Sequence, residues 1–130
     1  MLPRVSQYMD STVMTLNPET EIFEAVAFLL EHKVTGAPVV NEDNEVIGIL
    51  SEKDCLKLLA LGDDTHAPSG IVADFMSTRV TTIPLKTNIY FVAGMFLNDV
   101  VRRFPVVDDG KLVGAITRFD ILRAILAHFK

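Results

Sequence analysis

Two short stretches of the sequence carry a hydroxyl side chain followed three positions later by an aspartate. The stretch GILSEKDCL places Ser51 before Asp54, and the stretch GAITRFDIL places Thr117 before Asp120. An ionised carboxylate accepts hydrogen bonds from both hydroxyls of a vicinal diol, and each such bond contributes roughly 1.5–3 kcal/mol. A hydroxyl at a helix start suits a phosphate, because free amide hydrogens and the helix dipole favour an anion there. The spacing is therefore that of a small-molecule binding site.

The same spacing is also that of a capping box, in which the hydroxyl caps a helix and the acid reaches back to the cap amide. The motif alone favours this structural interpretation. Lys53 and Arg118 then lie in first helical turns, where a cation is unfavourable by a few tenths of a kcal/mol to about 1 kcal/mol unless an anion is near. That anion is either a bound phosphate or the neighbouring Asp54 and Asp120, so both interpretations stay open.

The chain contains two copies of one unit. Identical residues come into register at an offset of 67 positions, which becomes 66 after a turn that reads NEDNEVIG in the first copy and DDGKLVG in the second. We assign residues 1–62 to the first repeat, 63–70 to a linker and 71–130 to the second repeat. The matching pairs are Met9 with Met76, Thr15 with Thr82, Thr20 with Thr87, Ile22 with Ile89, Pro38 with Pro105, Gly48 with Gly114, and Asp54 with Asp120.

Each copy alternates between the apolar spacing of helices and that of strands. Each unit therefore reads as strand, helix, strand, strand, helix, and neither half can bury its apolar helix faces alone. This pattern predicts an α/β (α+β) fold. Thr20 is the expected N-cap of the first helix, and Asp109-Gly110 is a hairpin signal. The expected elements of the first copy are a helix at 21–33, strands at 37–40 and 46–50 and a helix at 52–61. In the second copy they are strands at 104–107 and 112–116 and a helix at 118–129, preceded by a helix with apolar residues Ile89, Val92, Ala93, Phe96 and Leu97.

Composition excludes several classes of protein. A net charge of -5 and a pI near 5.1 argue against a nucleic-acid-binding protein. The single Cys55 cannot form an internal disulfide and falls in an apolar helix stretch, which favours a buried structural thiol in a reducing compartment. The start MLPRVSQYMD lacks the apolar core of a signal peptide, and no stretch is long enough for a membrane helix, so we expect a soluble cytoplasmic protein.

Catalytic and metal sites are not indicated. His32 and His128 have no Ser, Cys or acid neighbour that completes a catalytic set, and Asp63, Asp64 and His66 match no defined metal-ligand spacing. The sequence therefore predicts no enzyme activity, no metal and no required cofactor.

The order of Met9, MTLNPET, VTGAPVVN and EVIGILSEKD resembles a CBS domain, named after cystathionine β-synthase. The second copy matches with Met76, VTTIPLKTN, VVRRFPVVD and KLVGAITRFD, so the resemblance spans nearly the whole chain in register. It implies a tandem pair, or Bateman module, of two β-α-β-β-α units related by a pseudo-two-fold axis. It also implies adenosine-containing ligands in clefts between the units, regulation of an enzyme, channel or transporter, and dimers.

The resemblance also implies a role for particular residues. It places a ligand ribose on Asp54 and Asp120, and a phosphate on Ser51 or Thr117. The base is expected against the segments near Thr15 and Thr82 and against the backbone of Gly36, Ala37, Pro38, Arg103, Phe104 and Pro105.

The two copies differ at these positions. Asn41 stands where family members often have aspartate, and Arg103 of the second copy stands where the first has Gly36. The second turn is the more favourable for an anion, because Arg118 follows its hydroxyl where the first copy has Glu52. We therefore expect Arg118, together with Arg103, to contact a ligand phosphate in the second site.

The sequence thus predicts a regulatory module that senses an adenosine-containing nucleotide, with AMP, ADP, ATP and S-adenosylmethionine as candidate ligands. It is expected to form a homodimer and to act on an unknown regulated protein. The alternative is an interaction module that dimerises without binding nucleotide. Apolar helix residues favour such an interface, and Phe23, Phe28 and Phe119 are the candidates for it.

Overall fold

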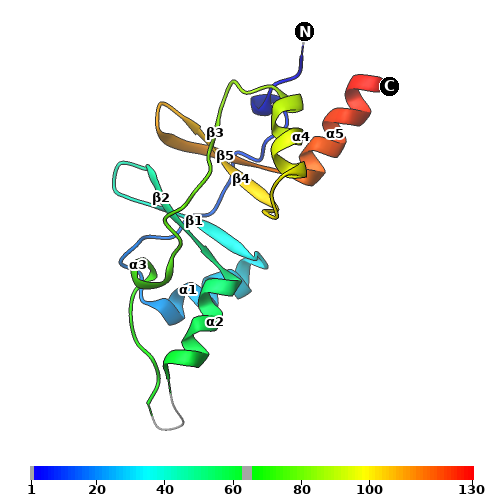
Figure 1. Cartoon of the computed structure of the whole chain (residues 1–130). Coiled ribbons are helices and arrows are strands. Elements are labelled where there is room, and N and C mark those ends of the chain that lie inside the picture. The colour runs from blue at the N-terminus through cyan, green and yellow to red at the C-terminus, as the bar shows by residue number, and fades with distance from the viewer. Residues whose placement is uncertain (1, 63–65) are drawn as a thin grey trace. The chain divides into compact units, whose positions relative to one another are not determined.

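A helix, an antiparallel pair of strands and a second helix follow one another in each repeat, as the sequence pattern predicts. In the computed structural model, which describes residues 2–62 and 66–130, the first repeat forms these elements from residue 22 onward (Figure 1). They are α1 (Ile22–His32), β1 (Gly36–Val40), β2 (Val46–Ser51) and α2 (Glu52–Leu61), and the short α3 (Val72–Phe75) follows the linker region.

The second repeat forms the same elements with a short strand in front. β3 runs parallel to β4, and β4 pairs antiparallel with β5, which gives the sheet order β3-β4-β5. The first repeat has an isolated parallel bridge between Leu16 and Val39 where the second has β3. The elements are β3 (Ile83–Pro84), α4 (Ile89–Leu97), β4 (Arg103–Asp108), β5 (Lys111–Thr117) and α5 (Arg118–Phe129). The 3-10 helix η1 (Val5–Gln7) lies near the start of the first repeat.

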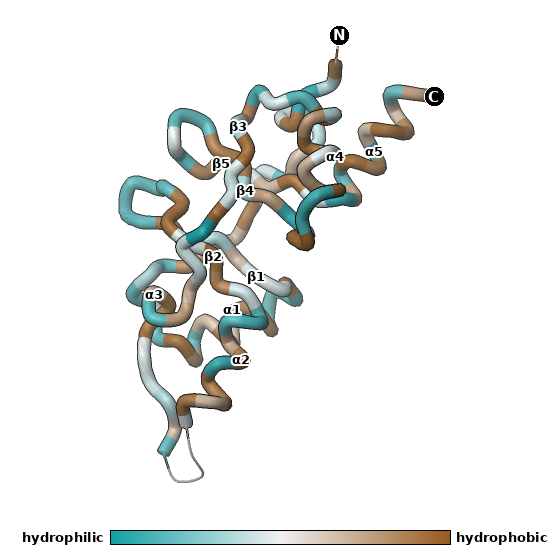
Figure 2. Tube along the Cα trace, in the orientation of Figure 1, coloured by the Kyte–Doolittle hydropathy of each residue, from teal (hydrophilic) through white to brown (hydrophobic). Residues whose placement is uncertain are grey.

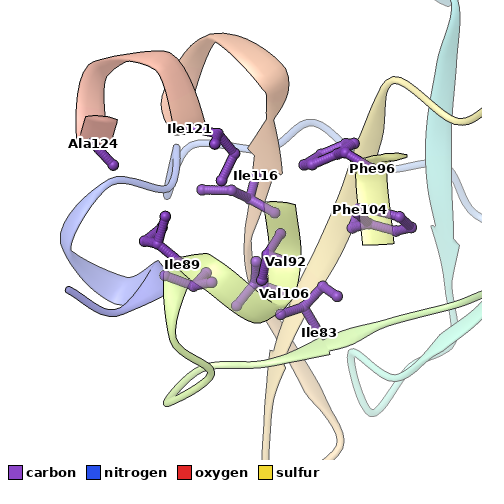
Figure 3. Close-up of a cluster of buried hydrophobic side chains, with 10 residues drawn as sticks. Ile83, Ile89, Val92, Phe96, Phe104, Val106, Ile116, Ile121 and Ala124 are labelled. Carbon is purple, nitrogen blue, oxygen red and sulfur yellow. The ribbon is translucent and has the colours of Figure 1, made fainter. Parts of the chain in front are cut away.

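The chain folds into two units, each with its own hydrophobic core. The first comprises Met14–Val80, and the second combines Met1–Val13 with Thr81–Lys130; we call them the 14–80 unit and the 81–130 unit. In the 81–130 unit, side chains from β3, α4, β4, β5 and α5 meet in one cluster, which includes Phe104, Val106 and Ile116 (Figure 3). The hydropathy along the trace shows these apolar stretches within each element (Figure 2). Residues 63–65 of the expected linker lie outside the described residues, and the repeat boundaries at 62 and 71 stay predictions.

Local side-chain contacts define where the elements begin. Glu21 is the N-cap of α1, because its carboxylate accepts hydrogen bonds from the amides of Phe23 and Glu24. The expectation that Thr20 caps this helix was wrong: its carbonyl accepts from the Val72 amide instead. Asp109 and Gly110 have φ angles of 51° and 79° in the turn between β4 and β5, which confirms the predicted hairpin.

Each unit contains the leading segment of the other repeat. The amide and carbonyl of Asp10 exchange hydrogen bonds of 2.9 Å with those of Ala115 on β5. The equivalent residues of the other unit, Ser77 and Ile49 on β2, exchange the same pair of bonds at 2.9 Å. The chain therefore completes each β-hairpin with a segment that comes from far away in the sequence.

Glycine makes this pairing possible. A Cβ on Gly114 would lie 2.7 Å from the Asp10 carbonyl oxygen and 2.8 Å from the Met9 sulfur. A Cβ on Gly48 would lie 2.6 Å from the Met76 sulfur. These distances are shorter than real Cβ contacts. Each repeat therefore needs a glycine at this position of its hairpin, because the methionine and backbone of the leading segment occupy the space of a side chain.

We predict that Gly114→Ala destabilises the protein by about 1–3 kcal/mol, because the methyl group displaces the leading segment from β5. Gly94→Ala is the matched control, since a Cβ there meets no atom within 4 Å and alanine favours the α4 helix by roughly 0.5–1 kcal/mol. Denaturant unfolding of both variants measures the difference. Equal stability of the two variants would contradict the close contact at Gly114.

Candidate ligand-binding sites at the strand to helix junctions

The predicted site residues gather at one junction in each unit. In the 14–80 unit, Gly36 at the start of β1 lies directly opposite Ser51 at the end of β2, and α2 follows at once. In the 81–130 unit, Arg103 at the start of β4 lies opposite Thr117 at the end of β5, and α5 follows. Each candidate site is thus built within one unit from the same three elements.

The remaining predicted residues lie beside these junctions with different exposure. Ala37 and Phe104 are only 3% and 1% exposed and belong to the cores, so only their backbone is open to a ligand. Pro38 and Pro105 are buried next to them. Thr15 precedes Leu16, whose amide donates to the Pro38 carbonyl, and Thr82 precedes β3.

The hydroxyl and aspartate of each motif form a capping box. The Asp120 Oδ2 atom accepts from the Thr117 amide at 2.8 Å and from the Thr117 hydroxyl at 3.0 Å, while the Asp120 amide donates to Thr117 Oγ1 at 3.3 Å. Ser51 and Asp54 make the same three bonds at 2.9, 3.0 and 3.2 Å. The structural interpretation of the motif is therefore confirmed, and a binding role has to be compatible with it.

The two aspartates are mostly buried, and each has a basic partner one turn further along its helix. Arg123 Nη1 lies 2.8 Å from Asp120 Oδ1, and Lys57 Nζ lies 3.3 Å from Asp54 Oδ1. The aspartate side chains are 8% and 13% exposed, respectively. These basic partners were missed in the sequence analysis, although a cation three positions after each aspartate was a visible signal.

Arginines surround the second junction. The Nε atom of Arg103 is buried and has no hydrogen-bond partner among the described groups. The pKa of Asp10 is lowered, first by the hydroxyl and amide of Thr12 that donate to it and further by the positive charge of Arg103. Within the described part of the chain, the Arg118 side chain makes one long hydrogen bond of 3.4 Å, to the Val101 carbonyl. The second junction therefore has guanidinium donors to spare, whereas the first has Gly36 in place of Arg103.

Two other features of the structure bear on the chemistry. Cys55 is half-buried against the core rather than fully buried, and burial, with the nearby Asp54 charge, raises the pKa of its thiol. Its thiol is therefore protonated at neutral pH and a poor nucleophile. Within residues 2–62 and 66–130, no three His, Cys, Asp or Glu side chains come together as a metal site, and no helix is long and apolar enough to cross a membrane.

An open hollow of about 510 Å³ lies over α4 and does not coincide with either junction. Its lining includes Tyr90, Phe91, Gly94 and Asn98, and it approaches the predicted site only through Thr81, the neighbour of Thr82. It is a feature of the exposed helix surface, and we do not assign the predicted ligand to it.

Comparisons with known proteins agree with this fold. The chain is 31% identical to CBS domain-containing protein CBSX1, chloroplastic, of Arabidopsis thaliana, over 95% of this chain and 66% of that protein. The structure of Arabidopsis CBSX2 in complex with AMP has a TM-score of 0.84 and 32% identity, and the match covers 98% of this chain and 99% of that one. The CBS domain pair of protein MJ0100, in complex with 5'-methylthioadenosine and S-adenosyl-L-methionine, has a TM-score of 0.78 and 25% identity, with 98% and 99% covered.

The chain spans between 42% and 66% of the length of the first curated relatives that it matches. The model of the CBS domain matches residues 5–61 and 72–127, which are the two copies found in the sequence. The chain therefore belongs to the CBS domain family, as a tandem pair of two mixed α/β CBS units.

Proposed function

We propose that the chain is a regulatory module that binds an adenosine nucleotide at the strand to helix junctions. One arrangement carries this proposal. Beside the helix start at Thr117, the buried carboxylate of Asp120 keeps free acceptor capacity, and Arg103, opposite Thr117, has a buried N–H with no partner among the described groups. The AMP in the complex of CBSX2 and the adenosine ligands in that of MJ0100 support the ligand class.

The capping box is compatible with a bound ribose phosphate. A carboxylate has about four acceptor directions, and Asp120 uses three of them, for the Thr117 amide, the Thr117 hydroxyl and Arg123. If the Thr117 hydroxyl donates to a ligand phosphate instead, a second direction on Asp120 becomes free. Two directions are what the two hydroxyls of a ribose require, so the phosphate and the diol suit the junction together.

The second junction is better suited than the first to bind a ligand phosphate. Free amides at the start of α5 and the α5 dipole favour an anion next to Thr117, and Arg103 and Arg118 add guanidinium donors there. In the first junction, Gly36 leaves that place without a side chain, and Glu52 adds a negative charge. We therefore infer that the second site prefers phosphorylated ligands, and that AMP, ADP, ATP and S-adenosylmethionine are the candidates to compare.

AMP is predicted to raise the melting temperature of the protein, because a ligand at 100 times its Kd stabilises the folded state by roughly 2.7 kcal/mol. Asp120→Asn is expected to remove most of this shift, since the amide donates where the carboxylate accepts. Asp54→Asn reports on the first site, and Asp108→Asn, an exposed aspartate at the end of β4, is the control. A melt that no nucleotide shifts would refute the proposal and favour the interaction module.

Arg118→Ala is predicted to weaken AMP binding roughly tenfold while adenosine binding stays unchanged, because only AMP presents a phosphate to the guanidinium. Titration calorimetry with both ligands measures the ratio of the two affinities. Arg102→Ala removes an exposed arginine of the same segment and should leave that ratio unchanged. An unchanged ratio in Arg118→Ala would show that the phosphate lies elsewhere.

Exposed apolar side chains favour the second candidate function, assembly into a homodimer. Helix α5 carries Leu122, Leu126 and Phe129 at 58%, 62% and 71% exposure, and an apolar groove of about 260 Å³ lies between α4 and α5. Phe23 and Phe119 are 46% and 76% exposed, as an interface residue requires, whereas Phe28 packs partly against the core. A surface of this kind is typical of a protein–protein interface, and nucleotide binding and dimerisation are compatible with one another.

We predict that the protein sediments as a dimer in sedimentation equilibrium. Leu126→Lys should dissociate this dimer, because a charged side chain in the apolar face of α5 opposes burial of that face. Ala127→Lys places the same charge on the next residue of α5, on the side of Arg123, and should leave the dimer intact. If both variants dissociated equally, or the wild-type protein were a monomer, α5 would not form the interface.

A further inference from the structure

Arg123 connects the buried aspartate of the second junction to a distant part of the chain. Its Nη1 atom donates to Asp120 Oδ1 at 2.8 Å, and its Nη2 atom donates to the Tyr8 carbonyl at 2.9 Å. Tyr8 belongs to the leading segment and lies two residues before Asp10, which pairs with Ala115 on β5. One guanidinium group thus joins the candidate ribose-binding carboxylate to a segment of the first repeat.

The first junction has a weaker version of this connection. Lys57 occupies the position equivalent to Arg123, and Phe75 the position equivalent to Tyr8. Lys57 donates to Asp54 at 3.3 Å, and in the described part of the chain no bond joins it to the Phe75 carbonyl. A guanidinium presents a rigid fork that can serve two acceptors at once, and an ammonium is a single point charge on a flexible stem. The connection from the aspartate through a basic side chain to the leading segment is therefore found at the second junction and not at the first, among the described residues.

We propose that Arg123 is a positioning residue that couples occupancy of the second nucleotide site to docking of the leading segment, residues 2–13. The inference rests on the proposed nucleotide site at Asp120. A ribose binds best to a carboxylate that is already held in place. Asp120 is held by Thr117 and by Arg123, and the Tyr8 carbonyl in turn fixes the guanidinium of Arg123. The ligand therefore binds more tightly when the leading segment is docked.

Coupling of this kind works in both directions. If docking of the segment raises the affinity for the ligand by some factor, the ligand favours docking of the segment by the same factor. Backbone bonds hold the segment to the rest of the 81–130 unit, among them those of Asp10 to Ala115 and that of the Val5 amide to the Thr87 carbonyl, and the Val5 side chain is buried in the core. A bound nucleotide should therefore slow the opening of the pairing between Asp10 and Ala115.

Amide hydrogen exchange of the full chain, with and without saturating AMP, tests this coupling. In the wild-type protein, AMP should slow exchange of the Asp10 and Ala115 amides roughly tenfold, within the usual range of coupling between sites. Arg123→Lys keeps a cation for Asp120 and loses the fork, so AMP should bind up to about tenfold more weakly than to the wild-type protein and should no longer slow these amides. Lys57→Ala, the matched change at the first junction, should keep the tenfold effect.

A purely structural role for Arg123 would lower the protection of these amides with and without AMP alike, and would leave the effect of AMP intact. That result, or full slowing by AMP in Arg123→Lys, would overturn the inference while the nucleotide site stands. Failure of AMP to bind the wild-type protein would overturn both. Arg123→Gln serves as the second variant if Arg123→Lys does not fold, and it should lose the AMP effect together with part of the affinity.

Discussion

The hydrogen bonds of the Asp120 carboxylate connect the strand, the helix and, through Arg123, the leading segment at the second junction. It accepts from the amide and hydroxyl of Thr117 and from Arg123, so one buried group fixes the end of β5, the start of α5 and, through Arg123, the leading segment. A buried aspartate of this kind is tolerated because its side-chain oxygens have hydrogen-bond partners. The sharp turn from β5 to α5, and with it the position of the candidate ligand groups of the second junction, depends on this arrangement.

The exchange of leading segments is the second constraint. Asp10 and Ser77 each pair with a hairpin of the other repeat, and a glycine, Gly114 or Gly48, leaves the room for the approach. A single repeat would expose the open edge of β2 or β5 and a groove shaped for a methionine. The two repeats therefore depend on one another through backbone pairing within each unit.

The two strand to helix junctions have the same capping hydrogen bonds but different side chains at the candidate sites. The capping bonds of the two junctions agree within 0.1 Å, but Arg103 replaces Gly36 and Arg123 replaces Lys57. These two exchanges add guanidinium groups to the second junction on either side of the same helix start.

The sequence by itself determined the repeat, the element order and the family resemblance, because apolar periodicity, the paired glycines and the hydroxyl-aspartate spacing are local signals. It placed α2 and α5 at the residues where they lie, since Ser51 and Thr117 cap their own helices. Only the tertiary structure decided which helix face remains exposed and that Tyr8 meets Arg123, a contact across 115 positions of sequence. It also decided the cap of α1, because Thr20 is engaged by Val72 and the neighbouring Glu21 takes its place. Bonds between distant segments leave no periodic trace in a single sequence, and that is why these features had to come from the fold.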